Sequence, residues 1–155
     1  MNGGDDKIPI GIQTFEEIIS GGYKYVDKTG FVYKLATAYK YVFLSRPRRF
    51  GKSLLSSTFQ AYFSGRKDLF NNLKAGNLEK EWKQHPVLYF DMSTAKHMTE
   101  ALLLEEMDKK LYEYEQTYGR GVKDVNINQR LEGLVHRSPG RSSVCEFEVI
   151  PMDVP

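Results

Sequence analysis

Apolar residues follow two spacings along the chain, and each spacing predicts a different element. Continuous runs of apolar, β-prone residues at Tyr41–Leu44 and Val87–Phe90 predict two short buried strands. Apolar residues that recur every three or four positions predict amphipathic helices. We expect these helices over residues 31–38, from residue 52 to a stop at 65, over 99–118 and over 128–137.

A further short helix is predicted ahead of these elements. Thr14-Phe15-Glu16-Glu17 has the form of a capping box, in which the Thr14 hydroxyl accepts from the Glu17 N–H and the Glu17 carboxylate reaches back. Gly21-Gly22 is expected to end this helix. In the helix that follows it, Phe31, Leu35 and Ala38 share one apolar side.

The order strand, helix, strand, helix is typical of a parallel α/β sheet. Two strands are few for such a sheet, because a parallel sheet is buried on both faces and normally contains more. The sequence therefore predicts an incomplete α/β fold with a mainly parallel sheet and a short helical region at its N-terminus.

The composition narrows the class of protein without changing this interpretation. The chain has 155 residues, 41% of them hydrophobic and 27% charged, which suits one globular domain. Its net charge of +2 is too small to indicate nucleic acid or a membrane as a partner. One cysteine excludes an intrachain disulfide, and the three histidines lack metal-ligand spacing. The N-terminus has no signal-peptide pattern and no apolar stretch approaches the ~20 residues of a membrane span, so we expect a cytoplasmic protein.

The turn between the first strand and the next helix carries the clearest chemical signal. Residues 46–53 read Arg46-Pro47-Arg48-Arg49-Phe50-Gly51-Lys52-Ser53. The second half fits the P-loop (Walker A) pattern G-x-x-x-x-G-K-[ST], and the pattern requires this position between a strand and a helix. Arg46 stands where the pattern has its first glycine, and Pro47 fixes one φ angle of the loop.

These residue types suit a phosphate group. The backbone N–H groups from Phe50 to Ser53 are expected at a helix N-terminus, where they point outward and the helix dipole favours an anion. Gly51 lets the backbone approach a phosphate closely. Lys52 is expected to reach the β- and γ-phosphates of a nucleotide, and the Ser53 hydroxyl to ligate Mg²⁺. The loop 46–53 is therefore the candidate nucleotide-binding site.

Two other interpretations of this loop remain open. Gly51-Lys52-Ser53 can start a helix in an ordinary α/β fold without binding a ligand. The basic cluster Arg46–Lys52 can also contact the phosphates of a nucleic acid, which predicts binding that weakens steeply with salt and needs no Mg²⁺.

The run from Tyr41 to Leu55 strongly resembles the bacterial AAA-ATPase-like family of P-loop NTPases, in which R-P-R-R-F-G-K-S stands as the P-loop. The resemblance covers residues 8–137 and includes four further segments: Ile8–Gly11, Tyr25–Thr29, Tyr62–Gly65 and Pro86–Ser93. It implies a three-layer P-loop NTPase sandwich that binds ATP with Mg²⁺. Many members of the family also carry a C-terminal PD-(D/E)XK nuclease-like domain.

An ATPase also needs a strand that ends in acidic residues, one for Mg²⁺ and one to polarise the attacking water. Asp91 follows the second apolar run and is a candidate Mg²⁺ ligand, but Met92 comes next. In the family, a strand of the type I-D-E-Y-D follows the region equivalent to 131–137. Residues 138–155 contain no such acidic pair. We assign no catalytic residue, and whether the chain is an enzyme stays open.

These observations predict a truncated family member. We expect a partial P-loop domain over 8–137 and a divergent tail over 138–155 that is irregular or disordered. ATP binding is then expected with weak or absent hydrolysis. A nonfunctional remnant is the third interpretation. A sheet that lacks strands exposes an edge, so an oligomer or a protein partner is also an expectation.

Overall fold

The structure, a computed structural model, describes residues 7–40, 42–44, 50–90, 99–138 and 145–148, the last of these by backbone alone. The chain divides into two compact units, residues 1–84 and 85–155. No helix within the described ranges is both long enough and apolar enough to cross a membrane.

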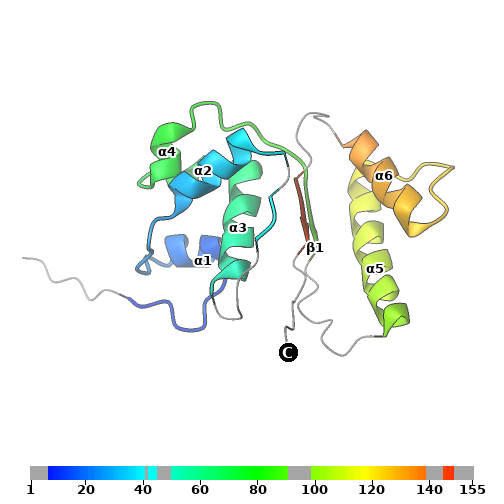
Figure 1. Cartoon of the computed structure of the whole chain (residues 1–155), viewed down its shortest axis with the longest axis horizontal. Helices are drawn as coiled ribbons and strands as arrows, with labels where there is room; N and C mark the ends of the chain where they lie inside the picture. Colours follow the sequence, from blue (N-terminus) through cyan, green and yellow to red (C-terminus); the bar gives the residue numbers. More distant parts are fainter. Residues whose placement is uncertain (1–6, 41, 45–49, 91–98, 139–144, 149–155) are drawn as a thin grey trace, which may run out of the picture. The chain divides into compact units, whose positions relative to one another are not determined.

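The first unit is helical (Figure 1). Its described elements are the helices α1 (Phe15–Ser20), α2 (Thr29–Ala38), α3 (Lys52–Phe63) and α4 (Lys74–Leu78), with a short 3-10 helix, η1 (Lys67–Phe70), between α3 and α4. Contacts of α3 with α1 and of α2 with both α3 and α4 hold these helices together.

Aromatic side chains form the core of the first unit. Phe70 is fully buried, and its ring centroid lies 4.8 Å from that of Phe15 and 5.0 Å from that of Trp82. Tyr62 packs edge-on against Phe63 with centroids 5.3 Å apart. Such rings bury more apolar area than any other side chain, so this cluster accounts for much of the unit's hydrophobic stabilisation.

Helix α1 begins and ends where the pattern predicts, but the capping box does not form. The Thr14 hydroxyl donates to the Glu17 carboxylate at 3.3 Å and makes no side-chain cap bond to the backbone. The N–H of Phe15 donates instead to the Ser57 hydroxyl of α3 at 2.9 Å. A tertiary contact therefore satisfies part of this helix end, which a local sequence pattern does not reveal.

Helix α2 begins two residues earlier than predicted and turns a different side inward. Thr29 and Val32 are buried, whereas Phe31 is 69% exposed. The apolar side suggested by Phe31 and Leu35 is therefore not the side with the deepest burial.

The second unit pairs two short strands with two helices. Strand β1 (Val87–Phe90) runs parallel to β2 (Cys145–Glu148), with Val87 opposite Cys145 and Phe90 opposite Glu148. The helices are α5 (Glu100–Tyr118) and α6 (Ile127–Arg137), close to the ranges that their periodicity predicts. Leu88 and Phe90 of β1 pack with Leu111 of α5 and Leu134 of α6, so the core lies between the strand and the two helices.

Buried ion pairs connect α5 to α6. The Arg130 guanidinium donates to both carboxylate oxygens of Glu115 at 2.7 and 3.0 Å, with both side chains almost fully buried. Arg130 also contacts Asp108. Near the end of α6, Arg137 donates to the buried Asp124 carboxylate at 2.5 Å. Paired charges satisfy one another's hydrogen-bonding needs, which permits their burial.

The expected fold class was wrong. The described residues are mostly helical, with a single pair of four-residue strands, and they do not form a three-layer α/β sandwich around a mainly parallel sheet. The predicted first strand is the main error, because its described part, Val42–Leu44, is not a strand and all three side chains are exposed. An apolar run can satisfy a strand pattern, but a strand also needs a neighbour for its N–H and C=O groups. Within the tail expected to be irregular, Cys145–Glu148 is a strand.

Candidate functional site

The predicted phosphate loop leads into the N-terminus of α3. Of its eight residues, Phe50, Gly51, Lys52 and Ser53 lie within the described part of the chain, and Arg46, Pro47, Arg48 and Arg49 lie outside it. The helix begins at Lys52, as predicted. The described part of the candidate site is therefore its second half, residues 50–53.

Gly51 has a left-handed backbone, with φ 74° and ψ 27°. Residues with a Cβ rarely adopt this conformation, which explains why glycine stands here. A left-handed residue directly before a helix turns successive N–H groups toward one point, and such a concavity favours an anion.

The first turn of α3 presents backbone donors ahead of the helical ladder. The Leu55 N–H donates to the Gly51 carbonyl at 3.0 Å, as the first α-helical bond. The N–H groups of Lys52, Ser53 and Leu54 precede it and have no acceptor within the helix. The first turn contains no acidic residue that would repel an anion.

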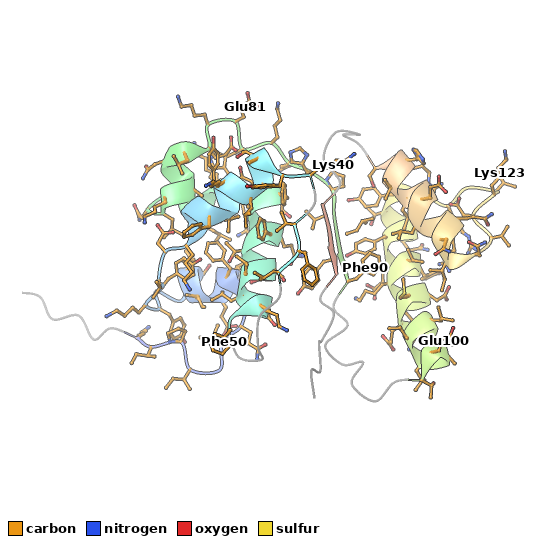
Figure 2. All side chains as sticks on the ribbon, in the orientation of Figure 1. Lys40, Phe50, Glu81, Phe90, Glu100 and Lys123 are labelled. Atoms are coloured by element: carbon orange, nitrogen blue, oxygen red, sulfur yellow. The ribbon has the colours of Figure 1, made fainter. Side chains whose placement is uncertain are left out.

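The described side chains of the loop are accessible to a ligand. Phe50 is 63% exposed beside the start of α3 (Figure 2), Ser53 is exposed and Lys52 is partly exposed. One cation, one hydroxyl and a row of N–H groups thus share a single helix turn. Cations and N–H groups form charge-assisted hydrogen bonds with phosphate, and hydroxyl oxygens are ligands that Mg²⁺ accepts.

The rest of α3 fixes this end in place. The Ser57 hydroxyl accepts from Phe15 N–H and donates to the Leu54 carbonyl at 2.9 Å, so it joins α3 to α1. Thr58, which is 1% exposed, also donates to the Leu54 carbonyl at 2.7 Å. Anchoring behind an exposed helix end keeps its donors oriented before a ligand arrives.

A second polar centre, which the sequence analysis missed, joins α2 to α4. One Asp27 carboxylate oxygen accepts from the Thr29 N–H and hydroxyl at 2.9 and 2.7 Å, and the other accepts from the Lys74 N–H at 2.8 Å. The buried Thr29 hydroxyl in turn accepts from the Ala75 N–H at 3.0 Å. Asp27 and Thr29 therefore cap two helices at once.

Electrostatics at Asp27 are consistent with a cap rather than a reactive acid. Burial acts to raise the pKa of Asp27, but hydrogen bonds from Thr29 and Lys74 and the Lys74 charge outweigh it and lower the pKa. The carboxylate is thus charged at neutral pH. The sequence feature that indicates this cap is an aspartate two residues before a helix. Its hydrogen-bond partner Lys74 lies 47 residues later in the chain, so this contact could not be predicted from local pattern.

Asp91, the candidate Mg²⁺ ligand, lies outside the described residues, directly after β1 in the second unit. Within the described ranges, no three histidine, cysteine, aspartate or glutamate side chains gather into a group that could hold a metal ion. The assignments of Ser53 and Asp91 to Mg²⁺ stay predictions.

Comparison with known proteins gives a family match and one similar protein. It matches the family described as predicted AAA-ATPase over residues 9–143, which includes α3 and the loop before it. It is 49% identical over 83 residues to a protein of Azotobacter chroococcum mcd 1 described as "Uncharacterized protein in vnfD 5'region". That alignment covers 53% of this chain and 16% of the relative, so the chain spans a small part of the relative's length. No solved structure matches the chain. Because the match extends over most of the sequence, the chain belongs to the predicted AAA-ATPase family.

Proposed function

We propose that this chain binds a nucleoside triphosphate, ATP, together with Mg²⁺, through residues 46–53. The observation that carries the proposal is the left-handed Gly51 that leads directly into the N-terminus of α3. Membership in a family of predicted ATPases supports the same ligand class. A lone G-K-S sequence is weak, but its combination with this backbone geometry is more specific.

Each described residue has a role in this proposal. The N–H groups at the start of α3 surround a phosphate, and Gly51 allows the backbone to approach it. Lys52 neutralises the β- and γ-phosphates as a mobile point charge. The exposed Ser53 hydroxyl would supply one oxygen ligand to Mg²⁺, which would help to neutralise the phosphate charge.

We propose further that hydrolysis by this chain is slow. Activation of the attacking water normally requires an acidic residue beside the one that organises Mg²⁺. Asp91 is followed by Met92, and residues 138–155 contain no adjacent pair of acids. Bound ATP is therefore expected to dissociate before it is cleaved.

Calorimetric titration of the full chain with ATP and Mg²⁺ tests the binding proposal. Lys52→Ala should weaken ATP binding by about 30- to 100-fold, the effect expected from loss of a charge-assisted contact. AMP binding should change little in the same variant, because AMP lacks the phosphates that Lys52 contacts. Lys34→Ala is the matched control, since it removes one positive charge from an exposed position of α2 in the same unit.

Other outcomes identify the alternatives. Equal ATP affinities of the wild-type and Lys52→Ala chains would remove the P-loop from the explanation. Binding of single-stranded oligonucleotides that needs no Mg²⁺ and weakens steeply with salt would favour the nucleic-acid interpretation of the basic loop. A folded chain without saturable ligand would favour a remnant. Phosphate release from the ATP-bound chain, followed over several binding lifetimes, tests slow hydrolysis separately.

A further inference from the structure

The outer edge of β1 is occupied by a side chain. The Tyr89 N–H donates to the Tyr114 hydroxyl at 2.7 Å, and the same hydroxyl donates to the Tyr89 carbonyl at 3.1 Å. One phenol from α5 therefore satisfies both backbone groups of a strand residue. A neighbouring strand would make these two kinds of bond in a regular sheet.

The strand geometry shows which edge this is. The N–H and C=O of one strand residue point to the same edge, and those of the next residue to the opposite edge. The Tyr89 N–H donates to the Tyr114 hydroxyl. The backbone hydrogen bonds between β1 and β2 are therefore made by the residues on either side of Tyr89. Tyr89 thus faces the edge away from β2.

Packing holds the phenol in this position. The Tyr114 ring lies edge-on to the ring of Phe90, with centroids 5.9 Å apart and planes at 61°. Tyr114 also packs against the buried cluster that contains Leu111, one helical turn before it on α5. The ring is therefore positioned from both α5 and β1, so the hydroxyl reaches the strand edge at little cost in side-chain entropy.

We propose that the Tyr114 hydroxyl closes the outer edge of β1 against pairing with another strand. An exposed strand edge readily pairs with other chains, and proteins block such edges by several means. Here the block is a hydrogen-bonding group that mimics a strand. Growth of the sheet is then directed to the far side of β2.

Tyr114→Phe tests this role because it keeps the ring and removes the oxygen. Hydrogen exchange of the Tyr89 amide, measured by NMR on the full chain, should become about five- to tenfold faster, as expected for loss of one net hydrogen bond. The variant should also associate with rising concentration in light scattering behind gel filtration, whereas the wild-type chain should not do so to the same extent.

Tyr112→Phe is the matched control, since Tyr112 is 58% exposed on the same helix. It should leave both measurements unchanged. Exchange at Tyr89 that is equally fast in the wild-type and Tyr114→Phe chains would overturn the proposal. Faster exchange of the Tyr89 amide in Tyr114→Phe without added association would confirm the hydrogen bond but overturn the proposal that it prevents strand pairing. If Tyr114→Phe does not fold, exchange in the wild-type chain still tests the hydrogen bond on which the proposal rests: a protected Tyr89 amide supports it, and an unprotected one overturns the proposal.

Discussion

The two units of the chain carry net charges of opposite sign. Residues 1–84 contain 14 basic and 8 acidic residues, whereas residues 85–155 contain 8 basic and 12 acidic ones. The net charge of +2 for the whole chain conceals a basic half and an acidic half. A basic unit raises the local concentration of anionic ligands, so the division agrees with a phosphate ligand at the start of α3.

The units also differ in where their cations lie. In the second unit, the Arg130 and Arg137 guanidinium groups pair with the buried carboxylates of Glu115 and Asp124. In the first unit, Lys52 lies partly exposed at the start of a helix whose first turn contains no acid. Arg130 and Arg137 thus stabilise the fold of the second unit, and we propose a ligand-binding role for Lys52 of the first unit. Substitutions can separate these two uses of charge.

The largest effect is expected at Arg130. Arg130→Met should destabilise the second unit by about 3 kcal/mol, because it leaves the Glu115 carboxylate buried without its partner. Far-UV circular dichroism during urea unfolding should show the loss of α5 and α6 at lower urea. Trp82, the one tryptophan, lies in the first unit and reports that unit separately by fluorescence.

Lys109→Ala is the control for Arg130→Met. Lys109 pairs with Glu105 and Glu106 on an exposed face of α5, and such solvent-screened pairs contribute little to stability. A similar loss of stability in both variants would mean that burial of the ion pair is not the cause. A shift of the Trp82 transition in Arg130→Met would show that the units do not unfold independently.

Neither the Arg130 pair nor the Asp27 cap could be predicted from local pattern. Arg130 meets Glu115 across the α5–α6 turn, and Asp27 meets the Lys74 N–H 47 residues away. By contrast, α3, α5 and α6 begin and end close to their predicted limits. Their apolar spacing and their end residues, such as the Thr99 cap of α5, are local signals.

The second prediction concerns Asp27. Asp27→Asn should destabilise the first unit by about 2 kcal/mol at pH 7, because an amide cannot accept charge-assisted bonds from Thr29 and Lys74 together. Since the folded state lowers the pKa of Asp27, its stabilisation is present above the ordinary value of 3.8 and is lost as the pH falls below it. The difference between the two chains should therefore shrink toward pH 3.

Urea unfolding followed by Trp82 fluorescence at pH 7 and pH 3 measures this difference. Asp68→Asn is a suitable control, because Asp68 pairs with Arg66 at an exposed site of the same unit. It should cost little at either pH. A constant difference between wild type and Asp27→Asn across this range would show that the Asp27 charge is not responsible.

The third prediction tests the backbone of the loop. Gly51→Ala should destabilise the first unit by about 1 kcal/mol, since alanine is strained at a φ of 74°. Gly30→Ala should be neutral or stabilising, because Gly30 lies in α2 with an ordinary φ, and an added Cβ would stand 3.6 Å from the Lys74 side chain. Thermal unfolding of both variants gives the comparison. Equal effects of the two alanines would contradict a left-handed Gly51.

The same loop shows which structural features can be predicted from the sequence and which cannot. The helix start at Lys52 follows from the pattern and is confirmed. The preceding strand was wrong, because apolar Val42–Leu44 carries no information about whether a neighbouring strand is present. The periodicity that predicts α5 records the apolar ring of Tyr114 but not the position of its hydroxyl. The ligand of Lys52 stays a prediction.

The smallest expected effect is the most diagnostic one. A positive side chain in the first turn of a helix faces the positive end of the helix dipole, so Lys52 is unfavourable for α3 itself. Lys52→Ala should therefore leave the stability of the first unit unchanged or raise it by up to about 0.5 kcal/mol. Unfolding of the ligand-free chain followed by Trp82 fluorescence measures this change. A clear loss of stability would assign Lys52 to the fold, whereas stability retained with ATP binding lost would assign it to the ligand.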